Sequence, residues 1–282
     1  MTVPSQLILE IDSRCNYRCP WCYCVWHEKN AAVPRNLPLT QWRKIIAAAA
    51  ANGVKSFLFT GGEATLRRGW MELLAWTREL LPEGELALFT NGSRLGETEL
   101  RFCRKHRIRL SVSLPGLRTY GEMTGTRRTY RPLLKLLLRA TELRWPASVS
   151  VTVNKVNYDE VPDIFSAIQI CGAESIQLNA MMLGGRGKNM TDQALTPEQW
   201  HDLKARIARL PGRVPYCFCG ETGCQCEPGA ARWRQWELEP PSACPAGKNF
   251  AVIAPDGMYR KCLHHSAIMG DWRQKFSSGG KG

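Results

Sequence analysis

The sequence predicts an α/β fold, an open or partial (β/α)6 barrel followed by a cysteine-rich extension. The chain has 282 residues, enough for one large domain or two modest ones with a sizeable core. From residue 5 to about residue 210, the apolar pattern alternates between the two-residue period of strands and the period of helices. Strict strand–helix alternation indicates a parallel sheet covered by helices, and six such units are too few for a closed eightfold barrel.

The expected elements follow in a regular order along the chain. We expect strands over residues 7–12, 56–60, 86–90, 109–114, 148–154 and 175–179. We expect helices over residues 40–51, 70–81, 97–106, 131–143, 161–170 and 197–210. Asn52-Gly53, Pro82 and Gly172 mark three of the helix ends. Because functional groups of such folds gather at the C-terminal ends of the strands, these ends are the place to look for a site.

Composition beyond the barrel suggests three regions: a barrel over 1–210, a cysteine-rich region over 211–276 and a flexible Ser/Gly tail over 277–282. Pro211 and Pro215 interrupt the periodic pattern. A hairpin is expected from residues 250–254 and 258–263, joined by Pro255-Asp256-Gly257. This region has too little apolar alternation for a core of its own, so we expect metal to stabilise it.

Charge and hydropathy exclude some classes of protein. Lys and Arg total 38 and Asp and Glu 25, a net charge of +13. The basic residues are scattered apart from Arg127, Arg128 and Arg131, which does not favour a nucleic-acid partner. No run of eighteen apolar residues predicts a membrane-spanning helix, and the first residues do not read as a secretory signal. We therefore expect a cytoplasmic protein.

Cysteine is the unusual feature of the composition, with twelve residues. Disulfides are rare in a reducing compartment, where clustered cysteines are more often metal ligands. Four cysteines fall between residues 15 and 24, and six lie beyond residue 216. Cys103 and Cys171 stand apart and are expected to be small buried hydrophobic residues.

The first cluster directly follows the first strand. Cys15, Cys19 and Cys22 have the spacing C-x3-C-x2-C. Three thiolates on a tight loop suit an iron–sulfur cube, and they leave one of its four irons without a protein ligand. An open metal position is typical of a catalytic centre. Structural zinc is the alternative, with Cys24 as a fourth ligand.

The arrangement Cys15-x3-Cys19-x-Trp21-Cys22 resembles the signature of the radical S-adenosylmethionine (radical SAM) superfamily. The resemblance implies a 4Fe-4S cluster whose open iron chelates the amino and carboxylate groups of SAM. An electron from the cluster then cleaves SAM, and the resulting 5′-deoxyadenosyl radical abstracts hydrogen from a substrate. It also implies a partial barrel, catalytic roles for the three cysteines, and a SAM site next to Trp21 and Tyr23.

Motifs at other strand ends extend the resemblance. Gly61-Gly62-Glu63 is on its own compatible with a tight turn, but after the second strand it resembles the motif that holds the SAM amino group. Paired glycines would let a ligand approach the backbone, and a carboxylate can accept from an ammonium. Thr90-Asn91-Gly92 resembles a further segment near SAM.

Polar residues on later strands are expected to face the same ligand, as implied by the family or as ribose and carboxylate contacts. The family often has Ser-Leu-Asp-Gly where this chain has Ser113-Leu114-Pro115-Gly116, so the aspartate is missing. An arginine within 127–131 is a candidate for the SAM carboxylate. The remaining candidates are Ser111, Ser113, Asn154, Gln177 and Asn179, and ordinary polar groups of a barrel are the alternative for the last three.

The C-terminal cysteines resemble the SPASM and twitch extensions of the superfamily, which hold auxiliary iron–sulfur clusters. The resemblance rests on Cys244, Gly257 and Cys262, with no cysteine after Cys262. Further ligands are expected upstream, from Cys217, Cys219, Cys224 and Cys226. Those four could instead form a separate zinc knuckle or a second cluster, and His264 and His265 are possible additional ligands.

The resemblance covers residues 7–270 and includes Gly184-Gly185-Arg186-Gly187. It implies a peptide-modifying enzyme that cross-links, epimerises or oxidises a ribosomally made peptide, with a flavodoxin- or ferredoxin-type electron donor. With no spare N-terminal region for a leader-binding domain, either a separate leader-binding protein or the barrel surface is expected to present the peptide. The alternatives are a radical SAM enzyme acting on a sugar, nucleotide or cofactor precursor, and a zinc-stabilised nucleic-acid-binding protein.

Overall fold

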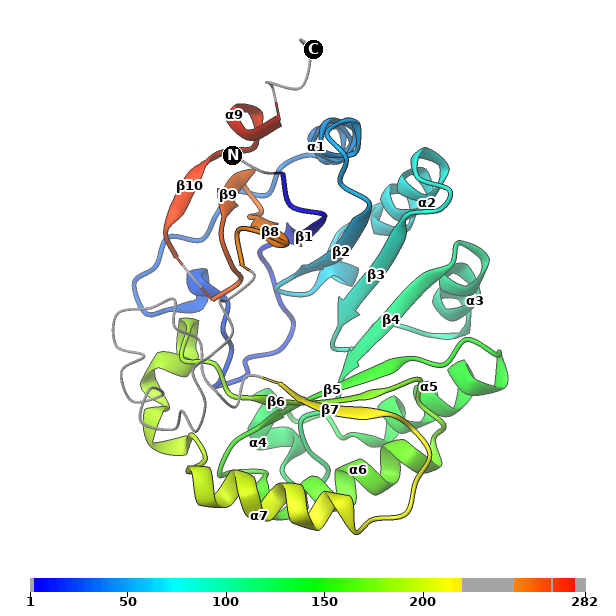
Figure 1. The fold of residues 1–282 in the computed structure, drawn as a ribbon, viewed down its shortest axis with the longest axis vertical. Helices are drawn as coiled ribbons and strands as arrows, with labels where there is room; N and C mark the ends of the chain where they lie inside the picture. The colour runs from blue at the N-terminus through cyan, green and yellow to red at the C-terminus, as the bar shows by residue number, and fades with distance from the viewer. Residues whose placement is uncertain (1–2, 220–245, 265, 277–282) are drawn as a thin grey trace.

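The computed structural model describes residues 3–219, 246–264 and 266–276, and it confirms the predicted α/β barrel (Figure 1). All ten described strands form one sheet, in the order β10-β9-β8-β1-β2-β3-β4-β5-β6-β7. The sheet curves around an interior, and helices cover its outer face (Figure 1).

The six predicted strands are present with ends within one or two residues of the prediction. The strands of the sheet are β1 (Gln6–Asp12), β2 (Ser56–Gly61), β3 (Glu85–Thr90), β4 (Ile108–Ser113), β5 (Ser148–Val153), β6 (Ile176–Ala180), β7 (Tyr216–Cys219), β8 (Phe250–Ile253), β9 (Met258–Arg260) and β10 (Ile268–Asp271). Neighbours from β1 to β7 are parallel, as strand–helix alternation requires.

The predicted helices are also present. The helices are α1 (Leu39–Ala51), α2 (Trp70–Leu80), α3 (Glu97–Lys105), α4 (Tyr120–Thr124), α5 (Arg131–Glu142), α6 (Val161–Ile170), α7 (Pro197–Ala208) and α9 (Trp272–Phe276). Short 3-10 turns are η1 (Val25–His27), η2 (Ala64–Leu66), η3 (Tyr158–Glu160), η4 (Gly185–Asn189) and η5 (Thr191–Gln193). None of the helices in the described ranges has the length and apolar character needed to cross a bilayer.

Alternation along the strands separates the core from the barrel interior. In β5, with the sequence Ser-Val-Ser-Val-Thr-Val, the valines are buried and the hydroxyl residues are partly exposed. The buried valines belong to the hydrophobic core that also includes the apolar faces of α5 and α6. Because successive side chains point to opposite faces, the hydroxyls of Ser150 and Thr152 are left facing the barrel interior.

The expected C-terminal hairpin forms, and it extends the barrel sheet. Strand β8 pairs in parallel with the free edge of β1, and β9 and β10 continue the sheet in antiparallel fashion. Gly257 makes the turn with a φ of +90°, which favours glycine. Ala251, Val252 and Ile253 are fully buried. The described part of 211–276 therefore shares the barrel's sheet and core, while the domain boundary at 210 and stabilisation by metal stay predictions.

Candidate functional site

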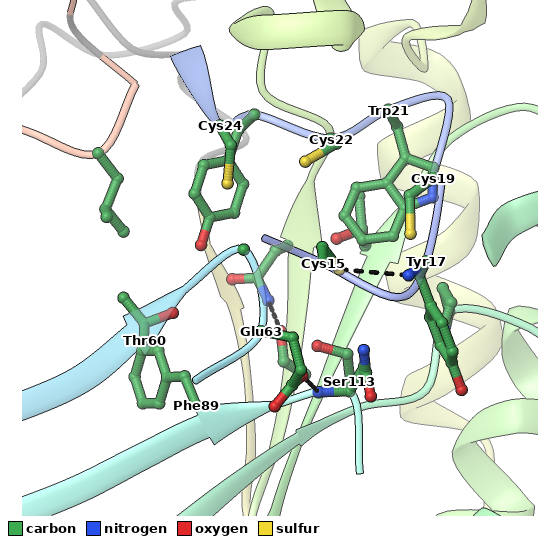
Figure 2. A pocket seen from close by; sticks show the side chains of 18 of the residues that line it. Cys15, Tyr17, Cys19, Trp21, Cys22, Cys24, Thr60, Glu63, Phe89 and Ser113 are labelled. Carbon is green, nitrogen blue, oxygen red and sulfur yellow. Dashed lines mark hydrogen bonds between the residues drawn. The ribbon is translucent and has the colours of Figure 1, made fainter. Parts of the chain in front are cut away.

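A cavity of about 400 Å³ opens where the carboxyl ends of the strands meet, beneath the loop that follows β1 (Figure 2). Nearly all of the predicted site residues of the barrel line it. They are Cys15, Cys19, Trp21, Cys22, Tyr23, Gly61, Gly62, Glu63, Asn91, Ser111, Ser113, Gln177 and Asn179. The structure thus brings together groups that lie up to 164 positions apart, from Cys15 to Asn179.

The three thiols of the first cluster are carried by a loop that arches over this cavity (Figure 2). Cys15, Cys19 and Cys22 are all partly exposed, and each lines the cavity. Burial raises the pKa of the Cys15 thiol to about 11 and raises that of Cys19 further. Cys22 differs, because hydrogen bonds with Cys24 and His27 hold its pKa well below the usual range. Its Sγ lies 3.2 Å from His27 Nδ1.

Helix α4 supports the loop from one side. The indole nitrogen of Trp21 donates to the carbonyl of Met123 at 2.7 Å, and Arg18 N donates to the carbonyl of Thr124 at 3.0 Å. A Cβ on Gly125 would lie only 2.4 Å from the Arg18 carbonyl oxygen, so the two backbones touch. These contacts hold the cysteine loop against α4 and the residue that follows it.

Turn η4 supports the loop elsewhere. Arg186 Nε donates to the carbonyl of Cys19 at 2.9 Å, and Gly187 N donates to that of Cys22 at 3.3 Å. A Cβ on Gly185 would lie 2.4 Å from the Cys24 carbonyl oxygen. In the sequence, Gly184-Gly185-Arg186-Gly187 contributes only to the family resemblance. In the structure, this segment contacts the backbone of the cysteine loop and holds it in place.

The glycines of Gly61-Gly62-Glu63 line the cavity, as predicted, and they also pack against the start of the cysteine loop. A Cβ on Gly61 would lie 2.3 Å from the Asp12 carbonyl oxygen, and one on Gly62 would lie 2.4 Å from that of Arg14. Gly62 N and Glu63 N donate to the same two carbonyls, both at 2.8 Å. Small residues are required because this segment packs directly on the start of the cysteine loop.

Glu63 is buried and firmly oriented. Its Oε1 accepts from Thr65 N at 3.0 Å, Thr65 Oγ1 at 2.6 Å and Thr90 Oγ1 at 2.8 Å. Its Oε2 accepts from Asn91 N at 2.7 Å. A carboxylate oxygen can accept more than one hydrogen bond, so Oε2 can still accept from a ligand in the cavity. Figure 2 shows Glu63 below the cysteine loop, near Ser113.

Neutral polar groups also line the cavity, beside apolar side chains such as Phe89 and Met182. Asn91 Nδ2 donates to Asn16 Oδ1 at 2.9 Å, which links the third strand end to the cysteine loop. Asn179 Nδ2 donates to Ser150 Oγ at 2.9 Å. Ser150 and Thr152 were missed, although the alternation of β5 points them to the same face as Ser111 and Ser113 on β4.

Some predicted contacts lie elsewhere or differ from expectation. Asn154 is fully buried and does not line the cavity; its Oδ1 accepts from Val156 N at 2.9 Å within a turn. Arg127, Arg128 and Arg131 line a second cavity, which weakens the expectation that one of them reaches SAM. Tyr23 lines the site, as predicted, and burial raises the pKa of its hydroxyl well above the usual value.

The C-terminal cysteines are only partly within the described residues. Cys262 is buried just after β9, whereas Cys217 is exposed on β7 near the opposite end of the strand order. Cys219 ends β7, and Cys224, Cys226, Cys244 and His265 lie outside the described residues. The ligand set of an auxiliary cluster therefore stays a prediction.

Residues just beyond Cys262 reach the main cavity, which sequence reasoning did not foresee. Leu263 and His264 line it, and the His264 ring packs edge-on against Tyr23 with centroids 4.9 Å apart. Burial lowers the pKa of His264 to about 4. The parallel pairing of β8 with β1 brings the β8–β9 hairpin and these residues to the cavity, and no local motif in the sequence signals it.

Together, the fold and the site define an α/β barrel with a parallel core sheet and a three-cysteine loop at the carboxyl ends of its strands. The chain belongs to the radical SAM superfamily, whose family model matches residues 9–168. This confirms the resemblance inferred from the cysteine spacing.

Individual relatives share the barrel at modest identity. The sporulation killing factor maturation protein SkfB of Bacillus subtilis is 25% identical over 186 residues, which are 65% of this chain and 44% of SkfB. A GTP 3′,8-cyclase of Rhodopseudomonas palustris is 30% identical over 199 residues, 66% of this chain and 56% of the cyclase. The chain spans about half the length of these curated relatives.

Solved structures confirm the fold. Streptococcus suis SuiB, in a crystal structure bound to its precursor peptide SuiA, superposes with a TM-score of 0.74 and 16% identity. The match covers 96% of this chain and 63% of SuiB. At this identity the likeness shows the shared fold.

The site fits the 4Fe-4S cluster and SAM that the family uses. Three thiols line one cavity, and a bound metal would offset the raised pKa of Cys15 and Cys19 by stabilising their thiolate forms. Across from them, Glu63 Oε2 is an anionic acceptor suited to an ammonium group. The hydroxyl and amide groups of the strand ends suit a ribose or a carboxylate.

Proposed function

We propose that this protein reductively cleaves SAM and abstracts hydrogen from a ribosomally made peptide. The observation that carries the proposal is the placement of three loop thiols and the oriented Glu63 carboxylate in one cavity at the strand ends. When bound, the cluster and SAM together supply a 5′-deoxyadenosyl radical for hydrogen abstraction. Cys15, Cys19 and Cys22 hold the cluster, and Glu63 holds the amino group of SAM.

The remaining residues position the cofactor and exclude water. Asn91, Ser111, Ser113 and Asn179 supply uncharged hydrogen-bonding groups for the ribose and carboxylate of SAM, while Trp21 and Tyr23 cover it from the cysteine loop. Asn154 stays a predicted contact, made only if the turn that buries it rearranges. Arg186 places a positive charge near Cys15 and Cys19, where it offsets part of the negative charge of the thiolates.

The relatives and the size of the cavity support a peptide substrate. SkfB is named as a maturation protein, and SuiB was crystallised with a precursor peptide. The cavity of about 400 Å³ is near the lower end of the range for small-molecule sites. With SAM inside, little enclosed volume is left, and a side chain of an extended peptide can enter from the mouth. A leader-binding protein and a cytoplasmic location belong to the same proposal.

A small-molecule substrate is the second candidate, favoured by one observation. The GTP 3′,8-cyclase relative matches at 30% identity, which is higher than the identity to SkfB. For such a substrate, Leu263 and His264 in the cavity lining would contact the nucleotide.

An auxiliary iron–sulfur cluster completes the proposal. We infer that Cys262 contributes to it with Cys244, and with one or two of Cys217, Cys219, Cys224 and Cys226. The burial of Cys262 beside residues that line the main cavity supports this placement. A zinc knuckle on the four upstream cysteines remains the alternative.

The test uses protein reconstituted anaerobically with iron and sulfide, supplied with SAM and dithionite. Release of 5′-deoxyadenosine is expected. Candidate peptides encoded beside the gene are then added, and mass spectrometry detects loss of two hydrogens or deuterium uptake from solvent. Modification of a peptide supports the first candidate. Turnover of GTP or another nucleotide, with every peptide unchanged, supports the second.

A further inference from the structure

A second cavity, of about 430 Å³, is strongly basic. Four arginines line it, and none of the described residues that line it is acidic. Arg118 is paired with Asp163 at 3.1 Å. The arginines are Arg118, Arg127, Arg128 and Arg131, and the last three are exposed and form no ion pair with other described residues.

This basic cavity lies close to the cysteine loop. Tyr120 of α4 lines it, and the Tyr120 hydroxyl lies 3.0 Å from that of Tyr17 on the loop. Tyr17 N in turn donates to Cys15 Sγ at 3.4 Å. A buried pair of aromatic rings therefore connects the basic surface to a predicted cluster ligand.

One short segment contributes to the lining of both cavities. It consists of α4 and the residues that follow it: Tyr120, Gly121 and Thr126 line the basic cavity, and Thr124 lines the main one. The carbonyls of Met123 and Thr124 accept from Trp21 and Arg18 of the cysteine loop. A protein seated on the basic cavity would approach the cysteine loop without entering the main cavity.

We propose that the surface formed by Arg127, Arg128 and Arg131 is the docking site of an acidic one-electron carrier protein. The docked carrier loses one electron, which passes to the cluster at Cys15, Cys19 and Cys22, and no bond or proton changes place. Opposite charges steer such encounters and orient the partners. The proposal rests on membership of the radical SAM superfamily and is independent of the peptide substrate.

An acidic substrate peptide is the competing occupant. A substrate must reach the main cavity, whereas an electron carrier needs access to the loop while SAM and substrate occupy that cavity. The aromatic pair of Tyr120 and Tyr17 runs toward Cys15 and gives no opening for a peptide, since both side chains are buried. The position of the basic cavity therefore favours the carrier.

The test compares binding and reduction in reconstituted protein. An oxidised, acidic bacterial flavodoxin is titrated into wild type and into Arg127→Glu/Arg128→Glu at low ionic strength by calorimetry. We expect Kd to rise at least tenfold in the variant and wild-type binding to weaken as salt is added. Release of 5′-deoxyadenosine should slow with reduced flavodoxin as donor and stay unchanged with dithionite, which needs no docking.

Matched variants keep the outcome interpretable. The control variant Arg104→Glu/Lys105→Glu changes the net charge by the same amount on α3, outside both cavity linings. It should leave flavodoxin binding unchanged, together with the rates of 5′-deoxyadenosine release with either donor. If the double variant fails to fold, Arg128→Gln gives a smaller effect of the same sign. Equal flavodoxin affinity in wild type and variant, or equally tight binding of a polyglutamate peptide, would overturn the proposal. If wild type releases no 5′-deoxyadenosine with dithionite, the result would instead count against radical SAM chemistry itself.

Discussion

The carboxylate of Glu10 on β1 is paired with the guanidinium of Arg260 on β9, and both side chains are almost completely buried. The pair ties the C-terminal hairpin to the strand that opens the fold, 250 positions earlier. Arg260 also lies over the ring of Trp26, 5.7 Å from its centroid.

Removing one partner of this pair should be costly. Arg260→Met leaves a buried carboxylate without its counter-charge, and we expect the free energy of unfolding to fall by about 3–5 kcal/mol. Urea denaturation measures the change. Arg273→Met, which removes an exposed pair with Asp271, should cost less than about 1 kcal/mol. Equal losses in both variants would contradict a special role for the buried pair, and Glu10→Gln/Arg260→Met should recover part of the stability.

Glu10 also predicts a pH dependence of stability in the metal-free protein. Burial raises the pKa of Glu10 to about 7 despite the opposing effect of Arg260, from an ordinary value of 4.5. Between these values the folded state holds a proton that the unfolded state has released. The stability that Glu10 contributes by binding this proton in the folded state is therefore fully present below pH 4.5 and is lost as the pH rises through about 7. Urea denaturation gives the free energy of unfolding of wild type and of Glu10→Gln. The difference between the two proteins should change between pH 5 and pH 8, and a difference independent of pH would exclude this contribution of Glu10.

Glu63→Gln should weaken SAM binding to the reconstituted protein. An ammonium loses a charged acceptor, worth roughly 1.5–3 kcal/mol, so Kd should rise about ten- to a hundredfold. Calorimetric titration with SAM gives the affinity. Thr65→Val removes a donor to Oε1 and keeps the charge, so its effect should be smaller. Unchanged affinity in Glu63→Gln would mean that the carboxylate serves only to cap η2.

Iron content should report two clusters, or about eight irons per chain. Replacing Cys15, Cys19 and Cys22 together by Ala should remove about half of the iron, because the C-terminal cysteines retain theirs. Cys244→Ala/Cys262→Ala should remove the other half and make residues 211–276 sensitive to protease. Cys103→Ala, at a buried cysteine outside the cavity, is the control. Full iron content in the Cys244/Cys262 variant would favour metal held by the four upstream cysteines alone.

Gly62→Ala tests whether the glycines are needed for packing on the cysteine loop. The added Cβ would lie 2.4 Å from the Arg14 carbonyl oxygen, a backbone atom that cannot move without the loop. We expect lower iron retention as well as weaker SAM binding, measured by iron assay and titration. At Gly96 an added Cβ meets only Glu99 Oε2 at 3.4 Å, so Gly96→Ala should change neither. A variant that binds iron normally but SAM weakly would instead mean that Gly62 only makes room for the ligand.

The sequence allowed prediction of what is local and periodic. The strand–helix alternation predicted the barrel, and the spacing of Cys15, Cys19 and Cys22 placed three thiols at one strand end. Strand β7 was missed because four residues inside a cysteine-rich segment show no usable period. The pairing of β8 with β1 was missed because long-range strand pairing leaves no local pattern.

The site shows the same division between local and long-range information. Polar residues at strand ends could be predicted because the C-terminal ends of parallel strands meet at one edge. The supports of the cysteine loop could not, since Met123 and Thr124 act through backbone carbonyls that any residue carries. Arg186 contacts the loop from 167 positions away, and only the surrounding glycines hint at close packing.

The position of β1 between β2 and β8 has a consequence for synthesis on the ribosome. Strand β1 must wait for the synthesis of residues 250–253 before one of its edges is paired. Until then, a strand containing the fully buried Leu7, Leu9 and Ile11 exposes unpaired backbone groups, a template for association with other chains. Nascent chains that stall before β8 should therefore depend on chaperones. Expression at lower temperature or co-expression of chaperones should raise the yield of folded protein more than substitutions within the first strand–helix units.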